Sequence, residues 1–156
     1  QVTDERNLET MPVGPLGIIP LESCKELGDK VKSYLLTADQ LLQKFSAFKG
    51  YQRDSYIIGT ATPRFGSGEA KGVIKESVRG DDLYIMVDVC NYNMTYSLYG
   101  YTNHMSPDDH FQDLKRIIAA VGGKAKRITV IMPFLYESRQ HKRTGRESLD
   151  CVLALQ

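Results

Sequence analysis

Residues 106–133, SPDDHFQDLKRIIAAVGGKAKRITVIMP, decide the fold of this 156-residue chain, because they predict a helix followed by a buried strand. Ser106 is a typical helix N-cap, Pro107 suits the first helical position, and Asp109 can bond back to the cap. An apolar stripe and two closing glycines complete the helix. These residues are Phe111, Leu114, Ile118 and Val121, followed by Gly122 and Gly123.

The strand prediction rests on residues 127–133, whose almost unbroken apolar run is typical of a parallel strand covered on both faces. Shorter apolar runs at 56–58, 72–74 and 83–87, bounded by glycine, proline and aspartate, predict further strands. Strand, helix and strand in this order imply a right-handed crossover. The sequence therefore predicts one α/β domain over residues 17–156, with a mostly parallel sheet flanked by helices.

The sequence pattern of residues 1–48 predicts an arm followed by two helices. Residues 1–16 are polar and broken by prolines and a glycine, so we expect a flexible arm there. Between residues 21 and 48 the apolar spacing predicts one helix, then a second that begins after Thr37 as its N-cap. Their apolar faces comprise Leu27, Val31, Tyr34 and Leu35, then Leu41, Leu42, Phe45 and Phe48.

The end of the chain predicts one more helix. Thr144 and Glu147 have the spacing of a capping pair, and the apolar residues Leu149, Val152 and Leu153 follow at helical spacing. No C-cap residue for this helix follows before the chain stops at Gln156. We therefore expect this helix to be cut off and the chain to be the first part of a longer protein.

Composition limits the classes of partner. Lys and Arg number 20 against 19 Asp and Glu, so the net charge of +1 gives no global attraction to nucleic acid or to an acidic membrane. No apolar run approaches the roughly 20 residues that span a bilayer, and residues 1–10 lack a signal-peptide layout. Cys24, Cys90 and Cys151 are odd in number and far apart, which indicates reduced thiols. We expect a cytoplasmic protein without a metal cluster, and neither nucleic acid nor a membrane as its partner.

Residues 64–82, RFGSGEAKGVIKESVRGDD, form the first candidate binding segment. Its glycines allow a tight backbone around Phe65, Ser67 and Glu69, which would place an aromatic face beside hydrogen-bonding groups, as a purine pocket requires. Ser77 and Arg79 suit a phosphate, because arginine offers a planar fork of donors. Taken alone, these residues fit a plain glycine-rich turn and a solvated strand end better.

The second candidate segment, residues 133–147, follows the buried strand. Ligands of open parallel sheets bind beyond the carboxyl ends of the strands, and this loop is expected at such an end. A run of basic or amide side chains there would attract a polyphosphate, although such a run is also typical of a solvated face. The run comprises Arg139, Gln140, His141, Lys142 and Arg143.

A third segment is rich in aromatic side chains. It contains Tyr92, Met94, Tyr96, Tyr99 and Tyr101. Alternating aromatics can stack on bases, but no basic residues interleave with them here. The pattern favours a half-buried edge or a subunit contact.

Together, the first two segments resemble ribose-phosphate pyrophosphokinases. The family pattern R-F-x-D-G-E, then E-S-V-R-G-x-D and an apolar strand, is similar to residues 64–86, with one substitution in its core. The pattern D-A-L-K-R resembles residues 113–116 with one residue missing, and R-I-x-x-x-x-P-Y-x-x-Y-x-R-Q-D resembles residues 127–140. The resemblance covers roughly residues 54–156 and is specific, because several motifs keep their order and spacing. It implies a phosphoribosyltransferase-like fold.

The resemblance also implies an activity, the transfer of pyrophosphate from ATP to ribose 5-phosphate with Mg²⁺, in a homo-oligomer. The turn that begins with Phe65 would reach the adenine of ATP bound to a neighbouring subunit, and the Arg-Gln pair would lie along the ATP. The ATP-binding residues implied in this way are Phe65, Ser67, Glu69, Arg139 and Gln140. Ser77 and Arg79 would belong to a regulatory phosphate site between subunits.

Several departures from the family pattern leave an alternative open. Ser67 and His141 each replace a family aspartate, and Ser148 replaces a proline. The aromatic segment at 92–101 has no clear family equivalent. A non-catalytic regulatory paralogue that acts in assembly is therefore the alternative to an enzyme. A nucleic-acid-binding module built on residues 139–143 is disfavoured by the near-neutral charge.

We expect the isolated chain to have no pyrophosphokinase activity. Family members continue with a metal-associated histidine, a mobile loop that carries a catalytic lysine and arginine, and an acidic loop that binds ribose phosphate. Residues 1–156 contain no counterpart of these, so the chain supplies no catalytic residue. Production of AMP by the purified chain from ATP, ribose 5-phosphate and Mg²⁺ would contradict this expectation.

Overall fold

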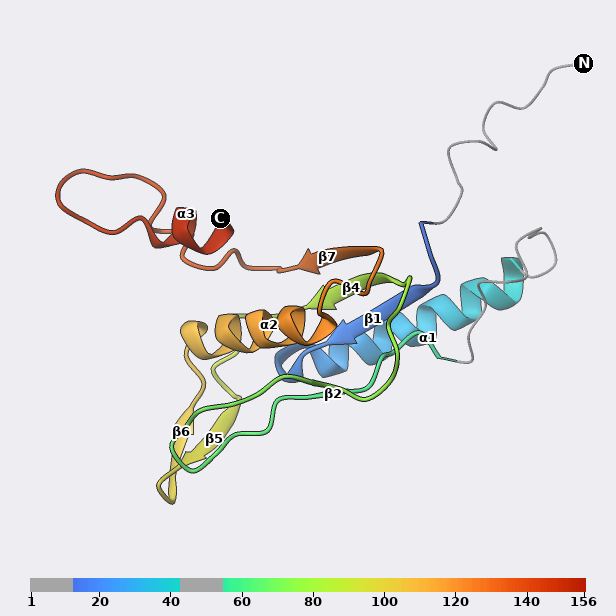
Figure 1. Ribbon diagram of the computed structural model, residues 1–156, viewed down its shortest axis with the longest axis horizontal. Helices are drawn as coiled ribbons and strands as arrows, with labels where there is room; N and C mark the ends of the chain where they lie inside the picture. Colours follow the sequence, from blue (N-terminus) through green and yellow to red (C-terminus); the bar gives the residue numbers. More distant parts are fainter. Residues whose placement is uncertain (1–12, 43–54) are drawn as a thin grey trace, which may run out of the picture.

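The computed structural model describes residues 13–42 and 55–156 (Figure 1). Its helices are α1 (Lys25–Leu42), preceded by the 3₁₀ turn η2 (Glu22–Cys24), then α2 (Pro107–Val121) and α3 (Asp150–Leu155). Its strands are β1 (Leu16–Pro20), β2 (Thr60–Ala61), β3 (Val73–Ile74), β4 (Asp82–Met86), β5 (Thr95–Leu98), β6 (Tyr101–His104) and β7 (Arg127–Ile131).

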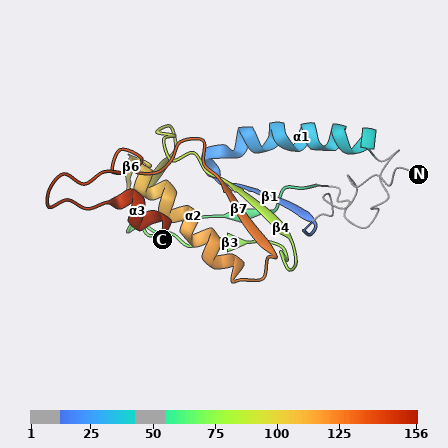
Figure 2. The ribbon, with the colours of Figure 1, turned by 90° about the horizontal axis from the view of Figure 1, so that it is seen from above.

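A parallel sheet of β1, β4 and β7, in that order, forms the centre of the described structure. Ile19 pairs with Ile85, and Ile85 pairs with Val130. Parallel neighbours cannot be joined by a tight hairpin, so the chain crosses over through α1 before β4 and through α2 before β7. Figure 2 shows α1 and α2 on opposite sides of the sheet. The prediction of an α/β domain with a parallel sheet flanked by helices is confirmed.

Each face of the sheet has its own core, because successive side chains of a strand point to opposite faces. On the side of α2, the buried side chains include Ile19, Leu83, Ile85, Leu114, Ile117 and Val121. On the side of α1, the buried residues are Ile18, Cys24, Tyr56 and Met86, with Val31 and Leu35 packed against them. Strand β4 therefore contributes to both cores.

Helix α2 begins as its sequence predicts. The Ser106 hydroxyl accepts a hydrogen bond from the Asp109 N–H at 3.2 Å, and the Asp109 carboxylate accepts one from the Ser106 N–H at 2.9 Å. The helix ends at Gly122, whose φ of 58° lies in the left-handed region. One residue of the predicted stripe is wrong: Ile117 is fully buried, whereas Ile118 is 36% exposed because it lies about 100° further round the helix.

Helix α1 corrects the prediction of two helices. Thr37 lies inside α1, where its hydroxyl donates to the Ser33 carbonyl at 3.0 Å, so it is not an N-cap. Leu27 and Tyr34 are exposed, and only part of the predicted face packs against the sheet. Phe45 and Phe48 lie outside the described residues.

Further differences concern the strands and the last helix. Strand β1 was not predicted, and residues 56–58 make only an isolated bridge from Ile57 to Ile18. Val130 and Ile131 are 38% and 40% exposed, so β7 is not covered on both faces within the described structure. Thr144 and Glu147 do bond to each other, but they precede Leu149, the N-cap of α3, and do not cap it.

We predict that Ser106→Ala lowers the free energy of unfolding by about 0.5–2 kcal/mol, because it leaves the Asp109 N–H at the start of α2 without its side-chain acceptor. Urea denaturation measures this change. Ser33→Ala is the matched control, since Ser33 lies within α1 and its hydroxyl only donates to the Asp29 carbonyl. Equal losses in the two variants would contradict a role for the cap.

Candidate functional site

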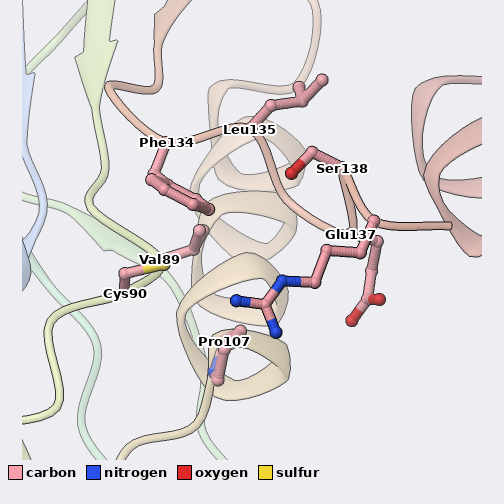
Figure 3. A pocket seen from close by; sticks show the side chains of 8 residues that line it. Val89, Cys90, Pro107, Phe134, Leu135, Glu137 and Ser138 are labelled. Atoms are coloured by element: carbon pink, nitrogen blue, oxygen red, sulfur yellow. The ribbon is translucent and has the colours of Figure 1, made fainter. Parts of the chain in front are cut away.

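A pocket of about 350 Å³ opens beyond the carboxyl ends of β4 and β7, at the start of α2 (Figure 3). This edge is where open α/β sheets bind ligands, because loops from neighbouring parallel strands meet there. The pocket is lined by Val89, Cys90, Pro107, Phe134, Leu135, Glu137, Ser138 and Arg139. Figure 3 shows Phe134 and Leu135 on one side and Pro107 on the helix opposite.

Tyr136 packs and hydrogen-bonds the loop after β7 against α2. Its ring stacks on Phe111 with centroids 4.1 Å apart, and its hydroxyl donates to the Asp108 carboxylate at 2.7 Å. The pKa of Tyr136 is raised well above its usual range. Burial is the largest cause, and the hydrogen bond to Asp108 is the next. Glu137 then adopts a positive φ of 55°, which turns the backbone. The residues after Tyr136 are thereby brought to the pocket.

The pocket combines apolar walls with a positively charged side chain. Arg139 is exposed, and no ion pair joins it to another residue in the ranges 13–42 and 55–156. The negatively charged carboxylate of Glu137 already accepts a hydrogen bond from the Gln140 side-chain amide. Asp108 and Asp109 lie in the first turn of α2 and oppose anion binding by the helix N-terminus itself. Arg139 is therefore the lining residue best placed to meet an anion.

The structure separates the residues of the predicted basic run. Arg139 lines the pocket at the expected edge of the sheet, but Gln140 is turned toward Glu137 and is not a lining residue. Lys142 and Arg143 are exposed and do not line this pocket. His141 lies against the Ser138 carbonyl, with its Nδ1 at 2.9 Å.

The candidate residues of the first segment lie elsewhere. Phe65 is 53% exposed, and the Ser67 hydroxyl donates to the Glu69 carboxylate at 3.1 Å within the same turn. Ser77 and Arg79 are exposed before β4, where the Arg79 N–H points at the Ser77 hydroxyl at 3.4 Å. None of these residues lines the pocket at Arg139. Within a single chain, the predicted residues thus do not form one site.

Sequence reasoning included one side of the pocket in its second candidate segment, residues 133–147, but it missed Val89, Cys90 and Pro107. Val89 and Cys90 follow β4, and Phe134 and Leu135 follow β7. The available signal was positional: the residues directly after two parallel strands meet at one edge. That signal becomes usable once β4 and β7 are known to be neighbours.

The described ranges, residues 13–42 and 55–156, contain neither a candidate metal cluster nor a candidate membrane span. Among those residues, no cluster of three or more His, Cys, Asp and Glu side chains could hold a metal ion. None of the helices described is long and apolar enough to cross a membrane.

Comparison with known proteins identifies relatives. A family model for the N-terminal domain of ribose phosphate pyrophosphokinase matches residues 16–156. Ribose-phosphate pyrophosphokinase 1 of Schizosaccharomyces pombe is 35% identical over 92 residues, which are 58% of this chain and 19% of that protein. The crystal structure of phosphoribosylpyrophosphate synthetase from Mycobacterium smegmatis matches with a TM-score of 0.55 and 26% identity, over 89% of this chain and 37% of that one. The chain thus spans well under half the length of these relatives.

The raised pKa of Tyr136 predicts a pH dependence of stability. A tyrosine whose pKa is higher in the folded state than its ordinary value of 10.0 contributes stability that is complete below that value and is lost as the pH rises through the folded pKa. We expect the free energy of unfolding of Tyr136→Phe to fall less than that of the wild type between about pH 8 and about pH 11.

Urea denaturation at the two pH values measures this difference. Tyr34→Phe is the control, because Tyr34 is 77% exposed on α1 and this variant should keep the wild-type pH dependence. Parallel pH profiles for Tyr136→Phe and the wild type would contradict the prediction.

Proposed function

The chain belongs to the ribose-phosphate pyrophosphokinase family, as an N-terminal domain, and we propose that it supplies part of the ATP site of such an enzyme. The proposed reaction transfers pyrophosphate from ATP to ribose 5-phosphate and gives 5-phosphoribosyl diphosphate and AMP, a step in nucleotide biosynthesis. The proposed location is the cytoplasm. The whole activity is proposed for a protein that also has the parts of these relatives that this chain does not match.

The observation that carries the proposal is the pocket at Arg139. Its apolar walls, from Val89, Phe134 and Leu135, suit the flat faces of a base or the carbon atoms of a ribose. The Arg139 guanidinium offers a planar fork of donors to phosphate oxygens. An apolar wall beside a cation is the combination that a nucleotide requires.

The remaining assignments follow from family membership. Gln140 is proposed to lie along the same ATP as Arg139. Phe65, Ser67 and Glu69 are proposed to contact ATP bound to a neighbouring subunit, which agrees with their position outside the pocket at Arg139. This arrangement requires a homo-oligomer.

Mg²⁺ and the regulatory site are also proposals. Mg²⁺ is proposed to arrive with ATP, because it is usually held through substrate phosphates and few protein carboxylates. Ser77 and Arg79 are proposed to bind a regulatory phosphate between subunits, where both are free to make contacts at the surface. The chain's own part in the reaction is to bind and orient the nucleotide, since transfer depends on alignment of the attacking hydroxyl with the β-phosphorus.

A non-catalytic regulatory paralogue is the alternative. Ser67 and His141 stand where the family has aspartates, which favours this reading. The reading frame that encodes the protein distinguishes the two. An intact acidic ribose-phosphate loop and a catalytic lysine after residue 156 would support the enzyme, and their loss would support the paralogue.

We predict that Arg139→Ala in the full-length protein raises the KM for ATP about 10-fold to 150-fold, because a hydrogen bond to a charged group contributes about 1.5–3 kcal/mol. The KM for ribose 5-phosphate should change less. Steady-state kinetics with each substrate varied in turn measure both constants. An unchanged dependence on ATP would show that the nucleotide lies elsewhere.

Arg146→Ala is the matched control, because Arg146 is exposed in the same loop but does not line the pocket.

Cys90 gives a second readout that requires no turnover. Its thiol is exposed on the pocket wall, whereas Cys24 and Cys151 are buried. MgATP should slow the alkylation of Cys90 in the wild type and protect it less in Arg139→Ala.

A further inference from the structure

The hairpin of β5 and β6 packs against the turn that carries Phe65. Figure 1 shows the hairpin projecting from the body of the domain, beside the segment that follows β2. The Tyr99 N–H donates to the Gly66 carbonyl at 3.0 Å, which joins the hairpin end to the turn. In β5, Tyr96 and Leu98 are half-buried while Thr95 and Ser97 are exposed. The tyrosine-rich hairpin therefore has an inner face, and that face meets the turn.

Arg64 links the turn to two other segments. Its guanidinium carbon lies 4.5 Å from the centroid of the Tyr96 ring. The same guanidinium donates to the Gly68 carbonyl at 2.9 Å and to the Asp113 carboxylate of α2 at 3.0 Å. The Arg64 and Asp113 side chains are only 10% and 8% exposed, so this ion pair is shielded from solvent. One cation thus connects the turn, the hairpin and α2.

Gly68 shows how closely the hairpin approaches. Its φ of 90° is a backbone conformation that residues with a side chain rarely adopt. A Cβ added at this position would lie 2.9 Å from the Leu98 side chain. Leu98 therefore packs directly on the backbone of the turn. Tyr96 thus packs on Arg64, which closes the turn, and Leu98 packs on Gly68 within it.

Without such contacts, a turn with glycines at 66 and 68 would sample many backbone conformations. A ligand that binds a mobile turn must offset the lost conformational entropy, and this weakens its affinity. Phe65 itself remains 53% exposed, so the turn is fixed while its aromatic side chain stays available. This combination is typical of a preorganised contact.

We propose that Tyr96 and Leu98 are positioning residues, which hold the turn so that Phe65 and Glu69 are presented to a nucleotide in a fixed geometry. The inference rests on the proposed function of the turn as a nucleotide contact. It gives a role to the aromatic segment at 92–101, which the family resemblance leaves without one. The Tyr96 hydroxyl is not needed for this role, because the face of the Tyr96 ring makes the contact with Arg64.

The test measures the Kd of the full-length protein for MgATP by titration calorimetry. Tyr96→Leu should raise this Kd roughly threefold to tenfold, because it removes the aromatic face under Arg64. Tyr96→Phe should restore the wild-type Kd, since it keeps that face. Leu98→Ala is a second variant that loosens the turn without touching Arg64, and it should also raise the Kd. Ribose 5-phosphate binding should not change in any of them.

Tyr101→Leu is the matched control, because Tyr101 lies on the same hairpin and is 77% exposed. Phe65→Ala separates the two proposals. If Phe65→Ala weakens MgATP binding but Tyr96→Leu and Leu98→Ala do not, positioning by the hairpin is overturned and the nucleotide contact stands. If Phe65→Ala has no effect, the contact itself fails and the positioning role is overturned with it. Equal weakening by Tyr96→Phe and Tyr96→Leu would also overturn it.

Discussion

Parallel hydrogen bonding holds β4 between β1 and β7, and both the hydrophobic core and the candidate pocket depend on that pairing. Because parallel strands need long crossovers, one helix is laid on each face of the sheet, and β4 is buried from both sides. The same pairing places the loops after β4 and β7 at one edge. The pocket with Arg139 forms at that edge because two such loops and the start of α2 meet there. The cross-strand pair of Asp82 and Arg127 adds a specific contact at the opposite end of the two strands.

Helix α2 is the common support of the two candidate binding segments. Asp108, in its first turn, accepts from the Tyr136 hydroxyl and holds the loop with Arg139. Asp113, five residues later, accepts from Arg64 and holds the turn with Phe65. The two carboxylates are separated by about 7.5 Å along the helix axis, from a rise of about 1.5 Å per residue. One rigid helix therefore fixes two segments that lie 74 residues apart in the sequence. The exact start of α2 matters for both, and the Ser106 cap specifies that start.

The sequence predicted those features that depend on neighbouring residues. The cap of α2, its closing glycine and the strands β4 and β7 were all foreseen, because their signals lie within a few residues of one another. The loop with Arg139 was foreseen for the same reason, since it directly follows a strand. Other predictions were wrong where tertiary packing outweighed a local preference. Thr37 bonds back to Ser33 inside a continuous helix, and Ile117 rather than Ile118 packs on the sheet. A spacing pattern does not reveal which side of a helix another element will cover.

The sequence by itself determined the α/β class, the family, and the segments that carry the candidate residues, because each depends on residue type and on short spacings. Only the tertiary structure decided which of these residues share a site. It brought Val89 and Phe134 together in the pocket of Arg139, left Phe65 outside it, and set Tyr96 under Arg64. The physical reason is that such contacts join residues far apart along the chain. Strand order and close backbone approach decide them, and no local pattern encodes either.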